Sequence, residues 1–585
     1  MDFAKIQKPD DVKKLSFGEL ADLADFCRKL ILKRTSAYGG HVGPDLGVVE
    51  LTLSLCKVFN FPKDKIVWDV SHQVDVWKML TGRMAAFIKP EPYSVIGEYT
   101  IPSEAPAYDL FYAGHTSPSI SLALGLARAR DMKGEKFNVI SFIGDGALSG
   151  GEAFEGLNEG AELRDNFIVI VNDNQMSIPH DHGGLYRHLR DLRESNGTSG
   201  NNFFKALGFD YYYIADGNDC SKIAETLEKV KDCTWPTVVH VNTQKGAGYI
   251  PAEANREEFH YSPPYYIQTG APKQADAGPD PVEVTRDYLL KKCKTMQELL
   301  IITTSTPEIF GFMEKERKEA NRHYLDLCIC EQTGVSVLAG AAKGGIKPVY
   351  PVEATFLQRA IDQMIEDLSL DMLPGVVVTF GCGVFGIPDA THLGFWDIPL
   401  LTNFPNLVYL APTGLKEYTA MLDWALGQNE YPVAVRIPCG PIEDAEVNPD
   451  TDYSELNKFK IIHKGSQIAI IAAGNFFERG KQTAKLLQGA GLDATLINPR
   501  FLSGIDTELL EQLEKDHKLV VTLEDGCVEG GFGSKITQYY GEKPIKVINC
   551  GLKKRFVDRY EPEALLKEYR LQPDQIAADI EAILK

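Results

Sequence analysis

The chain has 585 residues, of which 44% are hydrophobic and 24% charged, as in globular proteins with substantial cores. Its formal net charge is −20 and it has no basic block, so nucleic acid is excluded as an expected partner. Because the amino-terminal segment lacks the apolar core of a signal peptide and no stretch is apolar over the ~20 residues of a membrane span, we expect a cytoplasmic protein with no membrane partner.

The alternation of apolar runs and helical patterns predicts an α/β protein built from three blocks of mostly parallel sheet. In the first block, a helix is expected over residues 117–130, capped by Ser117, and a strand over 237–242. In the second, strands are expected at 299–304, 324–330, 349–352, 375–380, 407–410 and 433–437. In the third, they are expected at 468–472, 495–498, 519–523 and 545–548. The eleven cysteines show no zinc spacing and are expected to be reduced, mostly buried thiols.

A β-α-β unit in the first block carries the clearest functional signal. Residues 137–143 and 167–171 read as buried parallel strands, and 151–163 between them as a helix. The loop after the first strand lies at the carboxyl edge of the sheet, where open α/β sheets bind ligands and a helix amino terminus attracts phosphate. Ser149 stands where a dinucleotide fingerprint would have its third glycine, which disfavours a nicotinamide cofactor.

Asp145 lies in that loop and would face the same phosphates. Two anions need a cation between them, and Asp145 can give a carboxylate oxygen, Asn174 an amide oxygen and the bent turn after Asn174 a backbone carbonyl. Gly-Asp-Gly alone is more often a capped turn, but Asn-Asp-Asn at the end of the next strand favours the metal. The unit therefore predicts a magnesium diphosphate site.

Several longer motifs follow one another in a diagnostic order. They are "GDGALSGGEAFEGLN", "NDNQMSI", "CICEQTGVSVLAGAAKGG" and "TFLQRAIDQ", with "GHVGPDLGVVELTLSLCKVFN", "IVWDVSHQ", "AGHTSPSIS" and "VTLEDGCVEGGFGS" around them. In this order they resemble the transketolase superfamily, and within it the 1-deoxy-D-xylulose-5-phosphate synthase family, over nearly the whole chain. The resemblance implies a transketolase-like fold that binds thiamine diphosphate and Mg²⁺. It also implies a diphosphate-binding domain at 1–261, a linker at 262–293, an aminopyrimidine-binding domain at 294–445 and a transketolase C-terminal-like domain at 455–585.

The resemblance also assigns site residues. It implies that Asp145, Asn174 and the Met176 carbonyl hold magnesium. The residues expected to bind the cofactor are Gly144, Asp145, Gly146, Ala147, Asn174, Met176, Lys245, Glu331 and Phe356. Glu331, at the end of the predicted strand 324–330, would share a proton with the aminopyrimidine and is the principal catalytic candidate. Further catalytic candidates are Arg359, His41, His72, His115, His260 and His392, because imidazole supplies neutral donors and acceptors near pH 7.

By resemblance, the protein is a homodimeric enzyme of isoprenoid biosynthesis that acts on small molecules. It would transfer a two-carbon unit from pyruvate, with loss of CO₂, to an aldehyde or sugar-phosphate acceptor. Ketol transfer from a ketose donor, as in transketolase, remains open, as does a non-catalytic paralogue. The first component of a 2-oxo-acid dehydrogenase is disfavoured by the fused third block. Whether each site uses one chain or two is also open.

Four positions depart from the family pattern around the acceptor. Gly381 and Cys439 stand where arginines usually hold the acceptor's phosphate, and Glu353 stands where a tyrosine is usual. Asp389 lies three residues before His392, whereas the family aspartate lies four before it. Loss of two charge-assisted contacts, each worth roughly 1.5–3 kcal/mol, predicts an unphosphorylated acceptor or a different hold on its phosphate.

Overall fold

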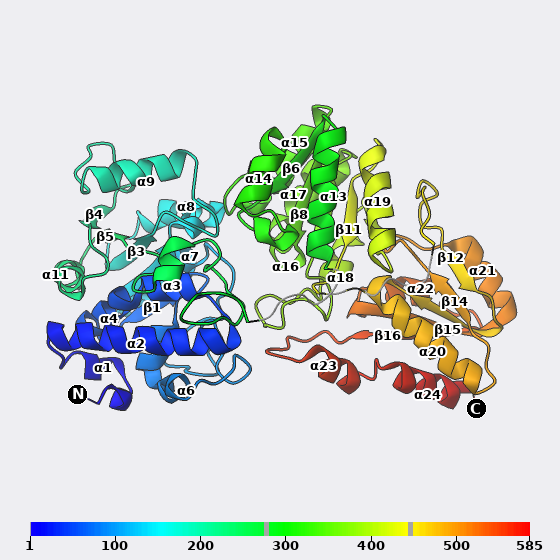
Figure 1. The fold of residues 1–585 in the computed structure, drawn as a ribbon, viewed down its shortest axis with the longest axis horizontal. Helices are drawn as coiled ribbons and strands as arrows, with labels where there is room; N and C mark the ends of the chain where they lie inside the picture. Colours follow the sequence, from blue (N-terminus) through cyan, green and yellow to red (C-terminus); the bar gives the residue numbers. More distant parts are fainter. Residues whose placement is uncertain (1, 274–279, 441, 443–447, 585) are drawn as a thin grey trace. The chain divides into compact units, whose positions relative to one another are not determined.

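The computed structural model describes residues 2–273, 280–440, 442 and 448–584. The chain divides into two compact units, Met1–Asp276 with Cys328–Cys330, and Ala277–Leu327 with Glu331–Lys585 (Figure 1). Within the described ranges, no helix combines the length and the apolar composition that crossing a bilayer requires. All eleven cysteines are free thiols, six of them buried, which agrees with their scattered spacing.

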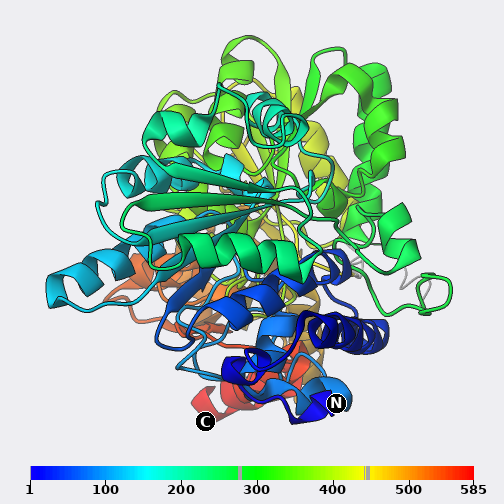
Figure 2. The same ribbon diagram turned by 90° about the vertical axis from the view of Figure 1, so that its left-hand side faces the viewer.

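The first unit contains a five-stranded parallel sheet with the strand order β1-β2-β3-β5-β4 (Figure 2). Its strands are β1 Lys65–Trp68, β2 Val139–Gly144, β3 Phe167–Asp173, β4 Asp210–Ile214 and β5 Pro236–Asn242. The longer helices are α2 Phe17–Tyr38, α4 Val49–Val58, α7 Ser119–Lys133, α8 Gly151–Gly160, α9 Gly184–Glu194 and α11 Cys220–Val230. The shorter ones are α1 Pro9–Val12, α3 Val42–Gly47, α5 Asp75–Lys78, α6 Ala85–Ile88, α10 Phe203–Leu207 and α12 Ile250–Ala254.

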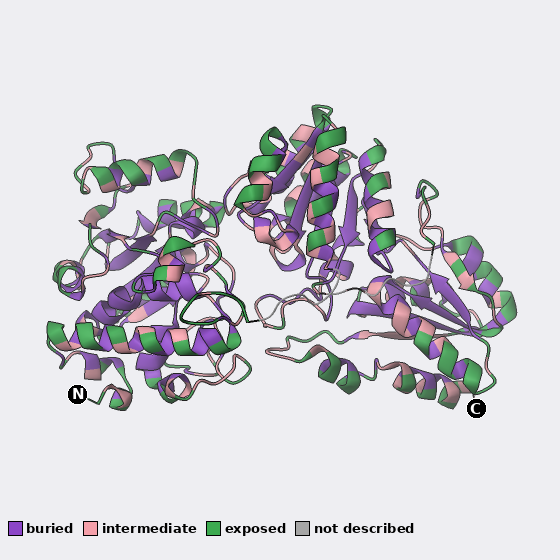
Figure 3. Ribbon diagram, in the orientation of Figure 1, coloured by how far each residue is buried: buried purple, intermediate pink, exposed green. Residues whose placement is uncertain are grey.

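Both faces of this sheet are covered, which explains why its strands are apolar throughout. Ile140 and Phe142 of β2 join the core under α2, α4 and α11, whereas Val139 and Ile143 join the core under α7 and α8. Successive side chains of a strand point to opposite faces, so a doubly covered strand must be apolar at nearly every position. Figure 3 shows the contrast between these buried strands and the surface helix α2, which alternates buried and exposed stripes.

The second unit contains two sheets. The first is parallel, in the order β10-β11-β9-β8-β6-β7. Its strands are β6 Leu299–Thr303, β7 Tyr324–Asp326, β8 Lys347–Glu353, β9 Val376–Phe380, β10 Val408–Leu410 and β11 Val433–Arg436. The helices are α13 Pro281–Thr295, α14 Glu314–Ala320, α15 Glu331–Lys343, α16 Ala354–Leu357, α17 Ile361–Gln363, α18 Asp397–Leu401 and α19 Leu415–Gly427.

The other sheet of the second unit has the order β12-β14-β13-β15-β16, and only its edge pair β12–β14 is antiparallel in the described part. Its strands are β12 Lys460–His463, β13 Gln467–Ala472, β14 Thr495–Asn498, β15 His517–Cys527 and β16 Lys546–Leu552. The helices are α20 Phe477–Gly489, α21 Thr507–Asp516, α22 Phe532–Tyr540, α23 Pro562–Glu568 and α24 Pro573–Leu584. Three mostly parallel sheets confirm the α/β fold class predicted from the sequence.

Two local predictions were wrong. The strand predicted over 324–330 ends at Asp326, because Cys328 has a φ of +61°, outside the β region. Ser117 does not cap α7: its φ is +81°, and its hydroxyl donates to the Ala147 carbonyl at 2.7 Å.

The predicted domain boundaries stay a prediction. Residues 274–279 of the expected linker lie outside the described ones. The same holds for 443–447, which include the expected end of the aminopyrimidine-binding domain at 445.

Candidate active site

Asp145 follows β2 and is anchored by backbone N–H groups. Its Oδ1 accepts from the Gly146 N–H at 3.1 Å, and its Oδ2 from the N–H groups of Asn174 at 3.0 Å and Gln175 at 2.5 Å. The carboxyl is only 1% exposed. Burial raises its pKa well above the ordinary value, and the negative charges of Asp181 and Asp173 add to this effect. The Asp145 carboxyl group is therefore fixed in place, and no lysine or arginine among the described residues pairs with it.

The turn after β3 brings Asn174 to the same edge of the sheet. Gln175 has a φ of +70°, which produces the predicted bend, and Asn174 Oδ1 accepts from the Met176 N–H at 3.2 Å. β2 and β3 are adjacent and in register up to Gly144 and Asn172, so the two strand ends present Asp145 and Asn174 together. Gly146 must lack a side chain, because a Cβ there would lie 2.6 Å from Ser177 Cβ.

These residues fit a magnesium ion by their donor chemistry. One carboxylate, one side-chain amide and a backbone carbonyl are hard oxygen ligands of the kind Mg²⁺ prefers. The neighbouring Asp181 supports this assignment, since its Oδ2 is buried without a hydrogen-bond partner in the described chain. Burial raises the pKa of Asp181 to about 7, although hydrogen bonds from Ser177 and the charge of Lys245 oppose the shift. A divalent cation would relieve this uncompensated negative charge.

Lys245 and three of the predicted histidines form a second cluster in the first unit. The Lys245 side chain is 1% exposed; its Nζ donates to the Ser177 carbonyl at 2.6 Å and lies 3.1 Å from His260 Nδ1. The ring centroids of His41, His72 and His260 are 5.0–5.3 Å apart. Ser177, next to Met176, therefore connects this cluster to the Asp145 turn. His115, the fourth histidine predicted in this unit, is partly buried in the loop before α7.

Two histidines of this cluster are held in their neutral form. Burial lowers the pKa of His72 and of His260 well below the ordinary value, and the charges of His41 and Lys245 lower both further. His72 Nδ1 is buried and has no hydrogen-bond partner in the described part of the chain. A neutral imidazole with an unused nitrogen can serve as a proton donor or acceptor for a bound reactant.

The depressed pKa values predict a pH dependence of stability. Below about pH 6.5 the unfolded chain protonates His72 and His260 while the fold does not, so their contribution to stability is lost as the pH falls. We expect the free energy of unfolding of wild type relative to His72→Gln to fall by up to ~1.4 kcal/mol per pH unit below 6.5. Urea denaturation of the cofactor-free proteins between pH 8 and 5 measures this. His180→Gln, which replaces an exposed histidine, is the control; equal pH slopes for wild type and His72→Gln would contradict the prediction.

Glu98 is a residue of this cluster that the sequence analysis missed. Its Oε1 lies 2.7 Å from His41 Nδ1 and also accepts from the His41 N–H at 2.9 Å. Burial acts to raise the pKa of Glu98, but the interactions with His41 outweigh it and the pKa lies below its ordinary value. The carboxylate thus orients the His41 ring. Its position in an irregular segment 57 residues from His41 gave no periodic signal.

In the second unit, Glu331 is the first residue of α15 and is 5% exposed. Burial raises the pKa of Glu331, and the Arg359 guanidinium, whose Nη1 lies 3.9 Å from Glu331 Oε2, opposes the shift. A proton on this carboxyl is therefore favoured relative to a glutamate in water. Glu331 begins a helix and does not end a strand, contrary to what its sequence context predicts.

Phe356 and His392 lie together in the same unit. The Phe356 ring, in α16, meets the His392 ring edge-on with the centroids 5.6 Å apart. His392 Nδ1 lies 2.8 Å from Thr391 Oγ1 and 3.6 Å from Asp389 Oδ1. The aspartate three residues before His392 therefore reaches the imidazole despite its shifted position in the sequence.

The two positions without arginine are neighbours in space. A Cβ built on Gly381, whose φ is +68°, would lie 3.5 Å from Cys439 Sγ. Cys439 is exposed in this unit and carries no positive charge. Arg436 does not replace the missing cations, because it is 3% exposed and bonds Asp397 at 2.6 Å and Asp525 at 2.5 Å. Gly381, Cys439 and Glu353 thus contribute no positive charge to this part of the second unit.

Comparison of the sequence with known protein families identifies the class of enzyme to which this chain belongs. Residues 3–202 and 196–243 match the family described as 1-deoxy-D-xylulose-5-phosphate synthase. Residues 297–441 match the pyrimidine-binding domain of transketolase, and 457–576 match its C-terminal domain. The fold and these matches define a thiamine diphosphate-dependent transferase of the transketolase type.

Full-length relatives narrow the class to one family. The 1-deoxy-D-xylulose-5-phosphate synthase of Clostridium beijerinckii is 36% identical over 612 aligned residues, covering 98% of this chain and 98% of the relative. That of Carboxydothermus hydrogenoformans is 36% identical and covers 99% of both chains. The chain belongs to the 1-deoxy-D-xylulose-5-phosphate synthase family. This confirms the resemblance inferred from the motifs.

Proposed function

We propose that the protein is a magnesium-dependent carboligase that transfers a two-carbon unit from pyruvate, with loss of CO₂, to an aldehyde. The observation that carries the proposal is Glu331, a buried carboxyl with a raised pKa in a chain 36% identical to named synthases. When bound, thiamine diphosphate supplies the electron sink that breaks the carbon–carbon bond next to a carbonyl. A homodimer is part of the proposal, and sedimentation of the purified protein tests it.

The first unit would hold the diphosphate end of the cofactor. Asp145, Asn174 and the Met176 carbonyl offer oxygen ligands to magnesium, with Gly144 and Ala147 flanking the turn. Gly146 lets the turn pack against Ser177, where a Cβ would not fit. The amino terminus of α8, at Gly151, would offer backbone N–H groups to the phosphate oxygens. Lys245, buried beside His260, carries the positive charge that would balance the phosphates.

The second unit would hold the aminopyrimidine end. Glu331 would share its proton with a ring nitrogen, a role that needs a carboxyl whose neutral form is accessible near pH 7. Arg359, 3.9 Å from Glu331, would keep that proton exchangeable by stabilising the carboxylate form. Phe356 would stack on the ring, and His392 would contact the reacting substrate from beside Phe356.

The same unit supports an unphosphorylated acceptor. Gly381, Cys439 and Glu353 provide no positive charge. The Arg436 guanidinium is already paired with the buried carboxylates of Asp397 and Asp525. A phosphate dianion beside Glu353 would find no guanidinium to bind it with two hydrogen bonds. A neutral hydroxyaldehyde would instead find a hydrogen-bonding carboxyl group in Glu353, whose pKa is raised by burial.

Product analysis tests the proposed reaction. Labelled pyruvate, thiamine diphosphate and Mg²⁺ are combined with D-glyceraldehyde or with its 3-phosphate, and products and CO₂ are followed by NMR. We expect CO₂ release with both aldehydes and a kcat/KM for glyceraldehyde at least equal to that for the phosphate. If product forms from a ketose donor and no CO₂ is released, the donor is a ketose and not pyruvate. A strong preference for glyceraldehyde 3-phosphate over glyceraldehyde would reject the unphosphorylated acceptor.

Restoring one arginine should shift this preference. In Cys439→Arg, a charge-assisted contact worth ~1.5–3 kcal/mol should raise kcat/KM for glyceraldehyde 3-phosphate relative to glyceraldehyde by about 10- to 100-fold. Cys293→Arg, which changes a partly buried cysteine of α13, is the matched control and should leave the ratio unchanged. An unchanged ratio in Cys439→Arg would show that position 439 does not face the acceptor.

A further inference from the structure

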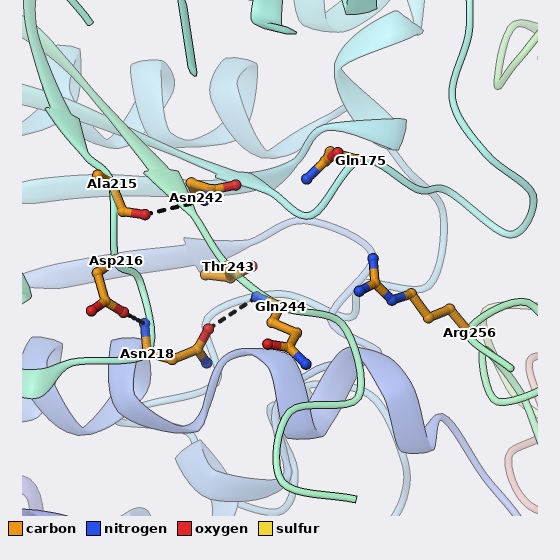
Figure 4. A pocket seen from close by; sticks show the side chains of 8 residues that line it. All are labelled: Gln175, Ala215, Asp216, Asn218, Asn242, Thr243, Gln244 and Arg256. Atoms are coloured by element: carbon orange, nitrogen blue, oxygen red, sulfur yellow. Dashed lines mark hydrogen bonds between the residues drawn. The ribbon is translucent and has the colours of Figure 1, made fainter. Parts of the chain in front are cut away.

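A polar cavity of about 270 Å³ lies in the first unit, where β4 and β5 end (Figure 4). Its lining includes Gln175, from the turn between the proposed metal ligands, and Thr243 and Gln244, which follow β5. None of His41, His72, His260 and Lys245 lines it. The cavity is therefore a separate feature from the histidine cluster, although it shares the Gln175 turn with the Asp145 site.

Some of the polar side chains that line the cavity form hydrogen bonds within the protein and hold the surrounding loops in place. Asn218 Oδ1 accepts from the Gln244 N–H at 2.9 Å, while its Nδ2 donates to the Gly47 carbonyl and to Glu50, both at 3.2 Å. Thr243 Oγ1 donates to Asn172 Oδ1 at 2.6 Å. These bonds fix the loops after β4 and β5, so the cavity has a defined shape.

The remaining polar groups have no protein partner. Arg256 is partly buried and forms neither an ion pair nor a hydrogen bond with any described residue. The side-chain amides of Gln175 and Gln244 likewise have no partner in the part of the chain that the structure describes. Asn242 Oδ1 is buried and unbonded, although its Nδ2 donates to the Ala215 carbonyl at 3.1 Å. Figure 4 shows the Arg256 guanidinium directed between Gln175 and Gln244.

The unbalanced charge of the cavity is positive. Asp216 is the acidic side chain in the lining, and its Oδ2 is paired with Lys222 Nζ at 2.8 Å. Arg256 thus has no counter-ion among the residues that the structure describes, in a chain whose net charge is −20. A planar guanidinium binds phosphate with two parallel hydrogen bonds, and a free amide oxygen such as that of Asn242 accepts from a hydroxyl.

We propose that this cavity binds a small hydroxylated phosphate monoester, with its phosphate on Arg256, Gln175 and Gln244 and a hydroxyl on Asn242. The volume is just below the ~300–1,000 Å³ typical of small-molecule sites, which suits a molecule of triose size rather than a nucleotide. The proposal goes beyond the carboligase reaction and does not depend on which acceptor that reaction uses.

Calorimetric titration of the holoenzyme, saturated with thiamine diphosphate and Mg²⁺, tests the site with glycerol 3-phosphate. We expect saturable binding to wild type and a loss of about 10- to 100-fold in affinity for Arg256→Gln. Arg164→Gln is the matched control, because Arg164 is exposed in the same unit and outside the cavity; it should bind as wild type. Glycerol without phosphate should not bind, and inorganic phosphate should bind more weakly because it cannot reach Asn242.

Gln244→Leu gives a second variant that does not depend on the arginine. Its side chain is exposed, so the fold should persist, and we expect a loss of about threefold or more in affinity. Binding of glycerol 3-phosphate to Arg256→Gln with wild-type affinity would place the ligand elsewhere, including the catalytic site, and would overturn the proposal. No binding of glycerol 3-phosphate to the wild-type holoenzyme at a concentration of about 10 mM would overturn the proposal as well.

Discussion

Glu331→Gln is expected to lower the turnover number for CO₂ release from pyruvate by about 10²- to 10⁴-fold, the range in which positioned acid–base groups contribute. Glutamine fills the same volume at the start of α15 but cannot exchange a proton with the aminopyrimidine. Because Glu331 is buried and burial raises its pKa, the neutral glutamine side chain is expected to fit the same surroundings. Steady-state kinetics with pyruvate and glyceraldehyde, together with calorimetric titration of thiamine diphosphate, measures the effect, and cofactor affinity should change only a few-fold.

Glu417→Gln is a matched control for this experiment. Glu417 is also a buried glutamate in the first turn of a helix of the second unit, and burial raises its pKa as well. It accepts from the Thr413 N–H and from Asn498 Nδ2, so its loss should lower the melting temperature while turnover stays within about threefold. A Glu331→Gln enzyme with near wild-type turnover would remove the basis of the proposed function.

The fold was predictable because local and tertiary requirements agree. β2 and β3 are apolar at nearly every position, which only a doubly covered parallel strand requires, and both lie where the apolar runs predicted them. The failures occur where a positive φ interrupts a regular pattern. The positive φ of Cys328 prevents β7 from continuing, and the positive φ of Ser117 prevents this residue from capping α7. Cysteine and serine rarely adopt a positive φ, so the sequence does not predict it.

The candidate site was predictable where chemistry and chain position coincide. Asp145 and Asn174 both follow buried strands, so their meeting at one sheet edge followed from the β-α-β pattern. Glu98 and Asp181 were missed because each lies in an irregular segment and acts through tertiary contacts, with His41 in one case and the Asp145 turn in the other. The cavity at Arg256 was also missed, since an arginine without a partner is recognisable only when its surroundings are known.

Asp145→Asn is expected to abolish the stabilisation that thiamine diphosphate and Mg²⁺ give to the protein. At ligand concentrations about 100-fold above Kd, binding adds ~2.7 kcal/mol to the free energy of unfolding, which a thermal melt detects as a rise in melting temperature. Replacing a residue that only hydrogen-bonds to a metal ligand typically lowers metal affinity by ~10- to 100-fold. Loss of the ligating carboxylate itself should therefore lower the affinity by at least ~100-fold and remove the rise in melting temperature.

The cofactor-free Asp145→Asn protein should stay folded. Asparagine keeps one side-chain oxygen for the N–H groups of Asn174 and Gln175, and it removes a buried charge that faces Asp181 without a cation. Asp210→Asn, at the exposed start of β4, is the control and should show the full wild-type rise with the ligands. Thermal melts with thiamine diphosphate alone, Mg²⁺ alone and both together separate the contributions. If Asp145→Asn and wild type rise equally when both ligands are present, Asp145 does not hold the metal, and the loop after β2 binds the diphosphate without it.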